Sequence, residues 1–357
     1  MSIAARPGSP LGWPGELRGP RENVELAERF RGVQVRSERG GERMGTERPE
    51  LSGTAADVVR KVAVVAHRKK TLGGGLEELR KRIAEETSTE PLWYEVSKSR
   101  KAPKRARAAL KEGADLVFVW GGDGIVQRCL DVLSGSATTV AIVPAGTANL
   151  LAGNLGIPKD LPEAVRIGFH GSRRKLDLGK VNGEHFAVMA GVGFDAAMLG
   201  DADRALKNRL GRLAYVWTGL RHVVDGAGTM RVTVDGQKWF RGRAGCLLVG
   251  NVGTITGGIR AFPDARPDDG WLEVGVTTAG NPLQWARTLG RMAVGRAEKS
   301  PLVQLTRGRR ITVKVAKPTA YELDGGARGK VTRLSARVVP DAVTICVPAG
   351  GAEAASR

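Results

Sequence analysis

The chain has 357 residues, of which 26% are charged and 41% hydrophobic, and its formal net charge is +19. This length is enough for two ordinary domains, and no apolar run approaches the roughly 18 residues of a membrane-spanning helix. We also expect no secretory signal, and the scattered cysteines and histidines predict neither a disulfide framework nor a zinc site.

The first 58 residues differ in composition from the rest. They are rich in Gly, Pro, Arg and Glu, and their nine Arg are balanced by nine acidic residues. Such a segment buries too little apolar surface to offset its ordering entropy, so we predict a disordered extension over 1–58. The charge excess therefore lies in residues 59–357, with 47 basic against 28 acidic side chains. It favours anionic partners such as nucleotide phosphates, acidic lipid headgroups or nucleic acid, although a high-Arg, solubility-driven composition would explain it as well.

Residues 59–170 have the pattern of an α/β domain. Short apolar runs predict buried parallel strands, and the segments between them carry apolar residues at helical spacing. Alternating strands and helices of these lengths predict a parallel sheet with flanking crossover helices. The predicted strands cover residues 62–66, 92–96, 116–120 and 139–143.

Residues 171–348 change to short alternating segments with turn signals. Asn182-Gly183 and Asp235-Gly236 stand between strand candidates as two-residue hairpin turns. We predict an antiparallel β-sandwich with two helices near 203–222 and 281–294, followed by a disordered tail over 349–357. The strand candidates are residues 176–181, 185–189, 230–234, 243–249, 272–276, 311–315, 334–338 and 343–347.

Three turns at the carboxyl ends of predicted parallel strands point to chemistry. GGDG at 121–124 ends one strand and opens a helix, where glycine backbone and a helix N-terminus favour phosphates. An Asp among phosphates implies a bound Mg²⁺ or a proton-accepting role. PAGTAN at 144–149 ends the next strand, and the basic turn HRKKTLGGG at 67–75 brings Lys70 and Thr71 to the same edge. Each turn alone reads as an ordinary loop, but together they predict one phosphate pocket.

These and further motifs resemble the diacylglycerol kinase catalytic-domain family, which includes bacterial lipid kinases and sphingosine kinases. The resemblance covers residues 60–348 and implies an ATP-binding α/β domain (59–170) and a lipid-substrate β-sandwich (171–348) with the active site between them. The matching motifs are GGDG (121–124), PAGTAN (144–149), LGIP (155–158), KLDLGKVNG (175–183), AGVGFDA (190–196), PDARPDDGWLEV (263–274) and ELDGG (322–326).

The resemblance also implies roles for single residues. Asp269, the backbone carbonyl of Trp271 and the acidic network around Asp177 would hold a metal, although the same loop is good turn chemistry without one. Asp123 and Asp324 are the candidate catalytic residues, and the cofactors would be ATP and Mg²⁺. Nucleotide contacts would come from Gly121, Gly122, Asp123, Gly124, Gly146, Thr147, Asn149, Lys70 and Thr71.

Two positions depart from the family pattern. Leu150 stands where an Asp usually follows the Asn, and Gly326 stands where the Asp-Gly-Glu motif carries its Glu, a favoured general base. Asp123 and Asp324 remain to accept the hydroxyl proton, with Glu322 nearby on the same strand face. Phosphoryl transfer depends mainly on positioning and charge neutralisation, so a changed base is compatible with activity.

Two helices bear on membrane contact. An apolar stripe edged by basic residues over 204–222 fits either an interfacial helix or one packed on the β domain. The basic helix over 98–112 fits either anionic headgroups or plain solvation. We expect a cytoplasmic enzyme, peripherally bound at the inner face of the membrane, that phosphorylates a lipid hydroxyl, foremost that of diacylglycerol. The resemblance also implies a homodimer as one option, but the sequence shows no interface for it.

Three other functions compete with this hypothesis. NAD kinases share a GGDG turn, so a soluble-substrate kinase is one. A catalytically weak lipid- or nucleotide-binding protein is the second, because of Leu150 and Gly326. Nucleic-acid binding rests on charge alone, and with aromatic residues at 5% the chain offers few stacking platforms. We therefore expect no nucleic-acid partner.

Overall fold

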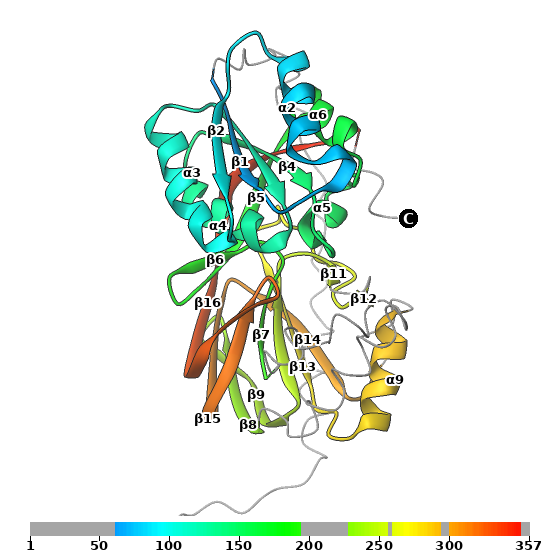
Figure 1. Ribbon diagram of the computed structural model, residues 1–357. Helices are drawn as coiled ribbons and strands as arrows, with labels where there is room; N and C mark the ends of the chain where they lie inside the picture. Colours follow the sequence, from blue (N-terminus) through cyan, green and yellow to red (C-terminus); the bar gives the residue numbers. More distant parts are fainter. Residues whose placement is uncertain (1–60, 194–227, 256–258, 294–299, 351–357) are drawn as a thin grey trace, which may run out of the picture. The chain divides into compact units, whose positions relative to one another are not determined.

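The computed structural model describes residues 61–193, 228–255, 259–293 and 300–350 (Figure 1). Four predicted features lie outside the described residues, at least in part. They are the extension over 1–58, the helix near 203–222, the end of the AGVGFDA motif at 194–196, and the tail from residue 351 onward.

A parallel sheet with the strand order β2-β1-β3-β4 forms the α/β part. Helices α2 and α6 pack on one side of it, and α3 and α4 on the other (Figure 1). The apolar runs predicted as strands are buried because helices cover both faces. The elements are β1 (Val62–His67), η1 (Leu72–Gly74), α2 (Gly75–Glu86), β2 (Leu92–Val96), η2 (Ser99–Lys101), α3 (Ala102–Lys111), β3 (Leu116–Gly121), α4 (Asp123–Leu133), β4 (Thr139–Pro144), α5 (Leu150–Asn154) and α6 (Leu161–His170).

Antiparallel strands form a β-sandwich in the second part, as predicted, around a separate apolar core that includes Val232, Leu247, Val274 and Ile311. Its elements are β5 (Ser172–Val181), β6 (Glu184–Phe186), β7 (Met189–Val192), β8 (Gly228–Val234), β9 (Gln237–Ala244), β10 (Cys246–Gly250), β11 (Thr254–Ile255), β12 (Ile259–Arg260), β13 (Leu272–Thr277), α9 (Pro282–Ala293), β14 (Val303–Gly308), β15 (Arg310–Leu323) and β16 (Gly326–Val347).

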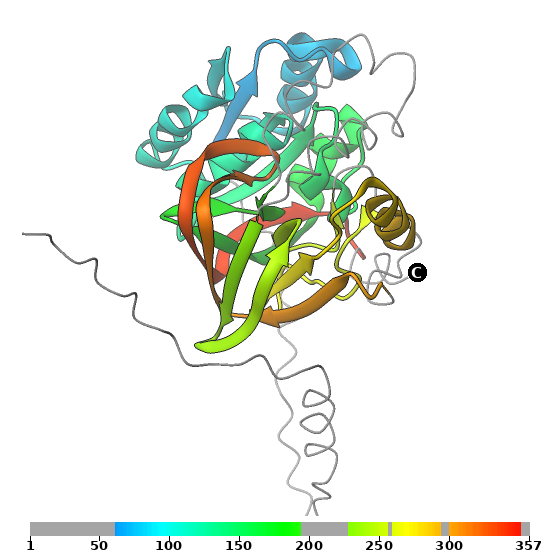
Figure 2. The same ribbon diagram turned by 90° about the horizontal axis from the view of Figure 1, so that it is seen from below.

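The long strand β16 joins the two parts of the fold, and the long strand β15 forms a hairpin with it (Figures 1 and 2). β15 pairs with β8 over its first half and with β7 at its end, so it is hydrogen-bonded to both of these strands of the sandwich. β16 continues past a register shift into the α/β sheet, where Thr344 and Ile345 pair in parallel with Thr139 and Val140 of β4. The strand pattern predicts two separate segments here, and the sequence gives no sign of this parallel pairing.

Asx-Gly pairs with positive φ form the tight turns that the sequence predicts. Asn182-Gly183 has φ values of 48° and 100°, and Asp235-Gly236 has 48° and 85°, as a two-residue hairpin requires. A third pair, Asp324-Gly325, has 47° and 75° and connects β15 to β16. This β15–β16 turn places a carboxylate at the tip of the hairpin.

The single strand predicted over residues 185–189 is wrong. β6 ends at Phe186 and β7 begins at Met189, because the N–H groups of Ala187 and Val188 donate to the Asp324 carboxylate, each at 2.8 Å. Backbone groups that bind a side chain leave the strand ladder. A carboxylate far along the chain therefore interrupts an otherwise apolar run.

Candidate active site

A cavity lies at the carboxyl ends of the parallel strands, where they meet the β15–β16 turn. Basic side chains, glycine backbone and the N-termini of two helices surround it, and such groups favour a bound phosphate. The lining residues are His67, Lys69, Lys70, Ser99, Gly122, Asp123, Gly124, Gly146, Thr147, Ala148, Leu150, Asp324, Gly325 and Gly326.

The two glycine turns touch each other at this edge of the sheet. A Cβ atom built on Gly146 would lie 2.5 Å from the Cα atom of Gly122, and one built on Gly122 would lie 3.0 Å from Gly146 Cα. The Ala145 N–H donates to the Gly121 carbonyl at 2.7 Å and ties the strand ends together. Glycine is needed at both contact positions because the backbones leave no room for a side chain.

Asn149 braces the PAGTAN turn from within. Its Oδ1 accepts from the Gly146 N–H at 2.8 Å, and its Nδ2 donates to the Gly146 carbonyl at 2.9 Å. Only 4% of Asn149 is exposed, and its φ of 51° is a left-handed value that Asn tolerates well. The structure therefore gives Asn149 a turn-forming role, while Gly146 and Thr147 face the cavity.

Asp123 is the first residue of α4 and links the two turns. Its Oδ1 accepts from the backbone N–H of Leu150 at 2.6 Å. Burial raises the pKa of Asp123, and hydrogen bonds from backbone N–H groups, foremost those of Leu150 and Asn149, partly offset this. The departure at Leu150 leaves this contact intact because it uses only the backbone.

Asp324 faces the cavity from the sandwich side. Only 6% exposed, it accepts from the N–H groups of Ala187, Val188 and Met189 at 2.8, 2.8 and 2.9 Å. Burial raises its pKa to about 6, the three N–H donors lower it, and the charge of Asp123 raises it again. The two candidate catalytic carboxylates thus line one cavity and interact with each other.

Glu322 lies close to Asp324 but does not line the cavity. It is 1% exposed, and neither of its carboxylate oxygens has a hydrogen-bond partner. Burial, and next to it the charge of Asp324, raise the pKa of Glu322 to about 7. A carboxyl group in this setting is largely protonated below neutral pH.

Hydrogen bonds hold the loop that the resemblance assigns to metal binding. Asp177 accepts from the Gly270 N–H at 2.6 Å and the Asp341 N–H at 2.9 Å, one on each oxygen. Asp269 accepts from the Trp271 N–H at 3.0 Å. Across the described parts of the chain, no three His, Cys, Asp or Glu side chains gather as a metal would require. The metal-binding role of Asp177, Asp269 and Trp271 therefore stays a prediction, and we derive no step through these residues.

Several lining residues were not predicted, and three of the predicted nucleotide contacts, Gly121, Asn149 and Thr71, are not among them. Lys70 lines the cavity but Thr71 does not, whereas His67 and Lys69 do. The basic turn that contains all four residues was the signal in the sequence for His67 and Lys69. Ser99 lines the cavity because η2 packs against α4, and nothing local in the sequence predicts that contact.

Known proteins resemble the chain along nearly all of the described residues. A family model described as diacylglycerol kinase catalytic domain matches residues 61–181. A second model, described as YegS C-terminal NAD kinase beta sandwich-like domain, matches residues 187–347.

Single relatives extend the same similarity. The "Diacylglycerol kinase" of Bacillus subtilis is 30% identical over 222 residues, covering 61% of this chain and 73% of the relative. The "Probable lipid kinase YegS-like" of Pseudomonas aeruginosa is 32% identical over 301 residues, covering 81% and 95%. The crystal structure of a putative diacylglycerol kinase from Bacillus anthracis has the same fold, with a TM-score of 0.69 at 21% identity, over 83% of this chain and 98% of that one.

Proposed function

Because the chain belongs to the family of diacylglycerol and YegS-like lipid kinases, we propose that it transfers the γ-phosphoryl group of ATP to a lipid hydroxyl. Diacylglycerol, giving phosphatidic acid, is the first candidate substrate. The observation that carries the proposal is the cavity in which glycine turns, Lys69, Lys70 and two carboxylates converge.

Each part of the cavity has a role in this reaction. The turns at Gly122 and Gly146 would hold the ATP phosphates with backbone N–H groups, and Lys69 and Lys70 would offset their charge. Mg²⁺, when bound with ATP, would screen the remaining negative charge. Asp123 or Asp324 would accept the proton of the attacking hydroxyl, and Asp324, with a pKa of about 6, is suited to accept it near neutral pH.

The acceptor would be a lipid presented at a membrane surface. No helix in the described part of the chain is long and apolar enough to span a bilayer. The exposed side of α3 and the turn before it carry Arg100, Lys101, Lys104, Arg105, Arg107 and Lys111, which would attract anionic headgroups. We propose peripheral binding at the cytoplasmic face of the membrane on this basis.

The test is transfer from γ-labelled ATP with Mg²⁺ into lipids in mixed micelles. Diacylglycerol, monoacylglycerol, sphingosine, ceramide and undecaprenol are compared with soluble NAD, and Asp123→Asn is the control variant. Label entering one lipid and lost in the control supports a lipid kinase and identifies its substrate. Label in NAD alone would favour a soluble-substrate kinase. ATP binding without any transfer would favour the weakly catalytic binding protein that Leu150 and Gly326 suggest.

A further inference from the structure

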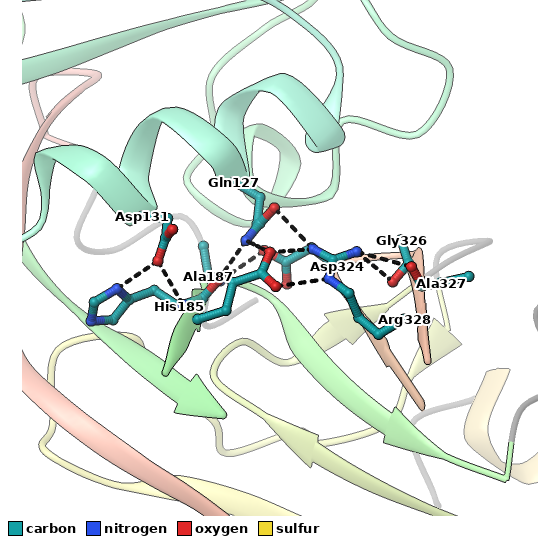
Figure 3. A network of polar contacts seen from close by, with 9 residues as sticks. Gln127, Asp131, His185, Ala187, Asp324, Gly326, Ala327 and Arg328 are labelled. Carbon is teal, nitrogen blue, oxygen red and sulfur yellow. Dashed lines mark hydrogen bonds and ion pairs between the residues drawn. The ribbon is translucent and has the colours of Figure 1, made fainter. Parts of the chain in front are cut away.

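A polar stripe runs along α4 toward the β-sandwich. Asp123, Gln127 and Asp131 are spaced by four residues, which places them on one face of the helix. Gln127 Nε2 donates to Glu184 Oε1 at 3.1 Å and to the His185 carbonyl at 2.6 Å (Figure 3). Asp131 Oδ1 accepts from the His185 backbone N–H at 2.9 Å. The helix that begins with a candidate catalytic residue is thus fixed to β6.

Arg328 connects the same residues to the β15–β16 turn. Its Nε donates to Glu184 Oε2 at 2.8 Å, and its Nη2 donates to Glu184 Oε1 and to Gln127 Oε1, the latter at 3.4 Å (Figure 3). Its Nη1 donates to the carbonyls of Gly326 at 3.0 Å and Ala327 at 3.2 Å. The Arg328 side chain is 14% exposed. A planar guanidinium can donate to Glu184 on one edge and to the backbone carbonyls on the other, which a Lys ammonium cannot do in the same geometry.

Arg328 also fills the space beside Gly326. A Cβ atom built on Gly326 would lie 2.8 Å from Arg328 Nη1 and 3.2 Å from the Leu323 carbonyl oxygen. Any side chain at position 326 would therefore compete with the guanidinium. The glycine that departs from the family motif and the arginine two residues later are physically linked, because a side chain at 326 and the guanidinium would compete for the same space.

We propose that Arg328, Glu184 and Gln127 form a clamp that holds Asp324 opposite Asp123 across the cavity. In this clamp Arg328 occupies the place that a side chain at position 326 would take. Arg328 acts as a positioning residue, since its donors bind protein groups on both sides. The proposal rests on the proposed kinase function, because its purpose is to set the distance between the two carboxylates of that site.

Two features of the Arg328–Glu184 pair support the clamp. The pair joins Arg328 to Glu184, which are 144 residues apart in the chain. Both side chains are largely buried, so removing one charge would leave the other poorly compensated. The hydrogen bonds from Arg328 lower the pKa of Glu184, so this carboxylate is charged and available to the guanidinium at neutral pH.

The test compares Arg328→Met and Arg328→Lys with Arg333→Met, a change at an exposed position on the same strand. We expect Arg328→Met to lower kcat about a hundredfold, as small displacements of reacting groups do, with an unchanged KM for ATP. Arg328→Lys should recover part of this loss because it keeps the charge, and it provides a milder variant if Arg328→Met folds poorly. Arg333→Met should match the wild type.

Native-state hydrogen exchange gives a second result that needs no turnover. The N–H groups of Ala187, Val188 and Met189 are protected by Asp324, so loosening the turn should speed their exchange about tenfold in Arg328→Met and leave it unchanged in Arg333→Met.

The two measurements separate the clamp from the proposed function. Faster exchange with an unchanged kcat would overturn the positioning role, and exchange equal to the wild type would overturn the clamp itself. If the wild type phosphorylates nothing, the proposed function fails, and exchange alone then decides whether the clamp exists.

Discussion

Replacing Glu322 by Gln removes a buried charge without changing the shape of the side chain. Glu322 is 1% exposed and its carboxylate oxygens have no hydrogen-bond partner. A neutral carboxyl and a neutral amide are close to equivalent in such a site, whereas a carboxylate bears the full desolvation cost. The stability difference between the two proteins should therefore depend on pH.

The sign and size of the difference follow from the pKa of Glu322. Burial raises it from 4.5 to about 7, so the folded state holds the proton more tightly than the unfolded state. As the pH rises from 4.5 to 7, the contribution of Glu322 to the free energy of unfolding of the wild type falls by about 1.4 kcal/mol per pH unit, or about 3 kcal/mol in total. Glu322→Gln lacks this fall, so it should equal the wild type near pH 4 and exceed it by about 3 kcal/mol at pH 8.

Urea unfolding of both proteins at pH 4, 6 and 8 measures this difference directly. Glu90→Gln, at an exposed carboxylate, is the matched control and should follow the wild type at every pH. A gap that stays constant between pH 4 and pH 8 would refute the assignment of a buried, unpaired carboxyl group at Glu322.

Three further predictions concern the cavity. Gly146→Ala should abolish ATP binding in calorimetry, because its Cβ atom would lie 2.5 Å from Gly122 Cα. The control Gly153→Ala has open space around its Cβ atom and should bind ATP normally. Equal ATP binding by the two variants would refute the tight contact. Asn149→Ala loses both hydrogen bonds to Gly146 and should weaken ATP binding about tenfold; unchanged affinity would remove its bracing role. Asp123→Asn should still bind ATP but lower kcat at least about a hundredfold, and normal turnover would exclude Asp123 from catalysis.

Local sequence patterns predicted much of the fold. The apolar runs that became β1, β3 and β4 are buried on both faces, and hydrophobic pattern alone signals such strands. The Asn182-Gly183 and Asp235-Gly236 turns depend on the φ values of two adjacent residues, which the residue types already favour. The glycine turns after β3 and β4 were found because glycine clusters at the ends of predicted parallel strands are typical of phosphate sites.

Contacts between distant residues were beyond the reach of such patterns. Asp324 interrupts the strand expected over 185–189 from more than 130 residues away. The two hydrogen bonds between the Asn149 side chain and Gly146 were likewise not expected from the sequence. Asp177 braces the loop expected to bind metal by accepting from the N–H groups of Gly270 and Asp341, which no local pattern indicates.

The sequence by itself determined the strands, the hairpin turns and the phosphate-favouring glycine edge, because these follow from the chemistry of neighbouring residues. The tertiary structure alone decided how the carboxylates are used. Asp123 and Asp324 interact because the β15–β16 turn lies at the cavity and β16 then pairs with β4 of the α/β sheet. The Arg328 side chain lies beside Gly326 because Glu184 and Gln127, both distant in the chain, bind its guanidinium.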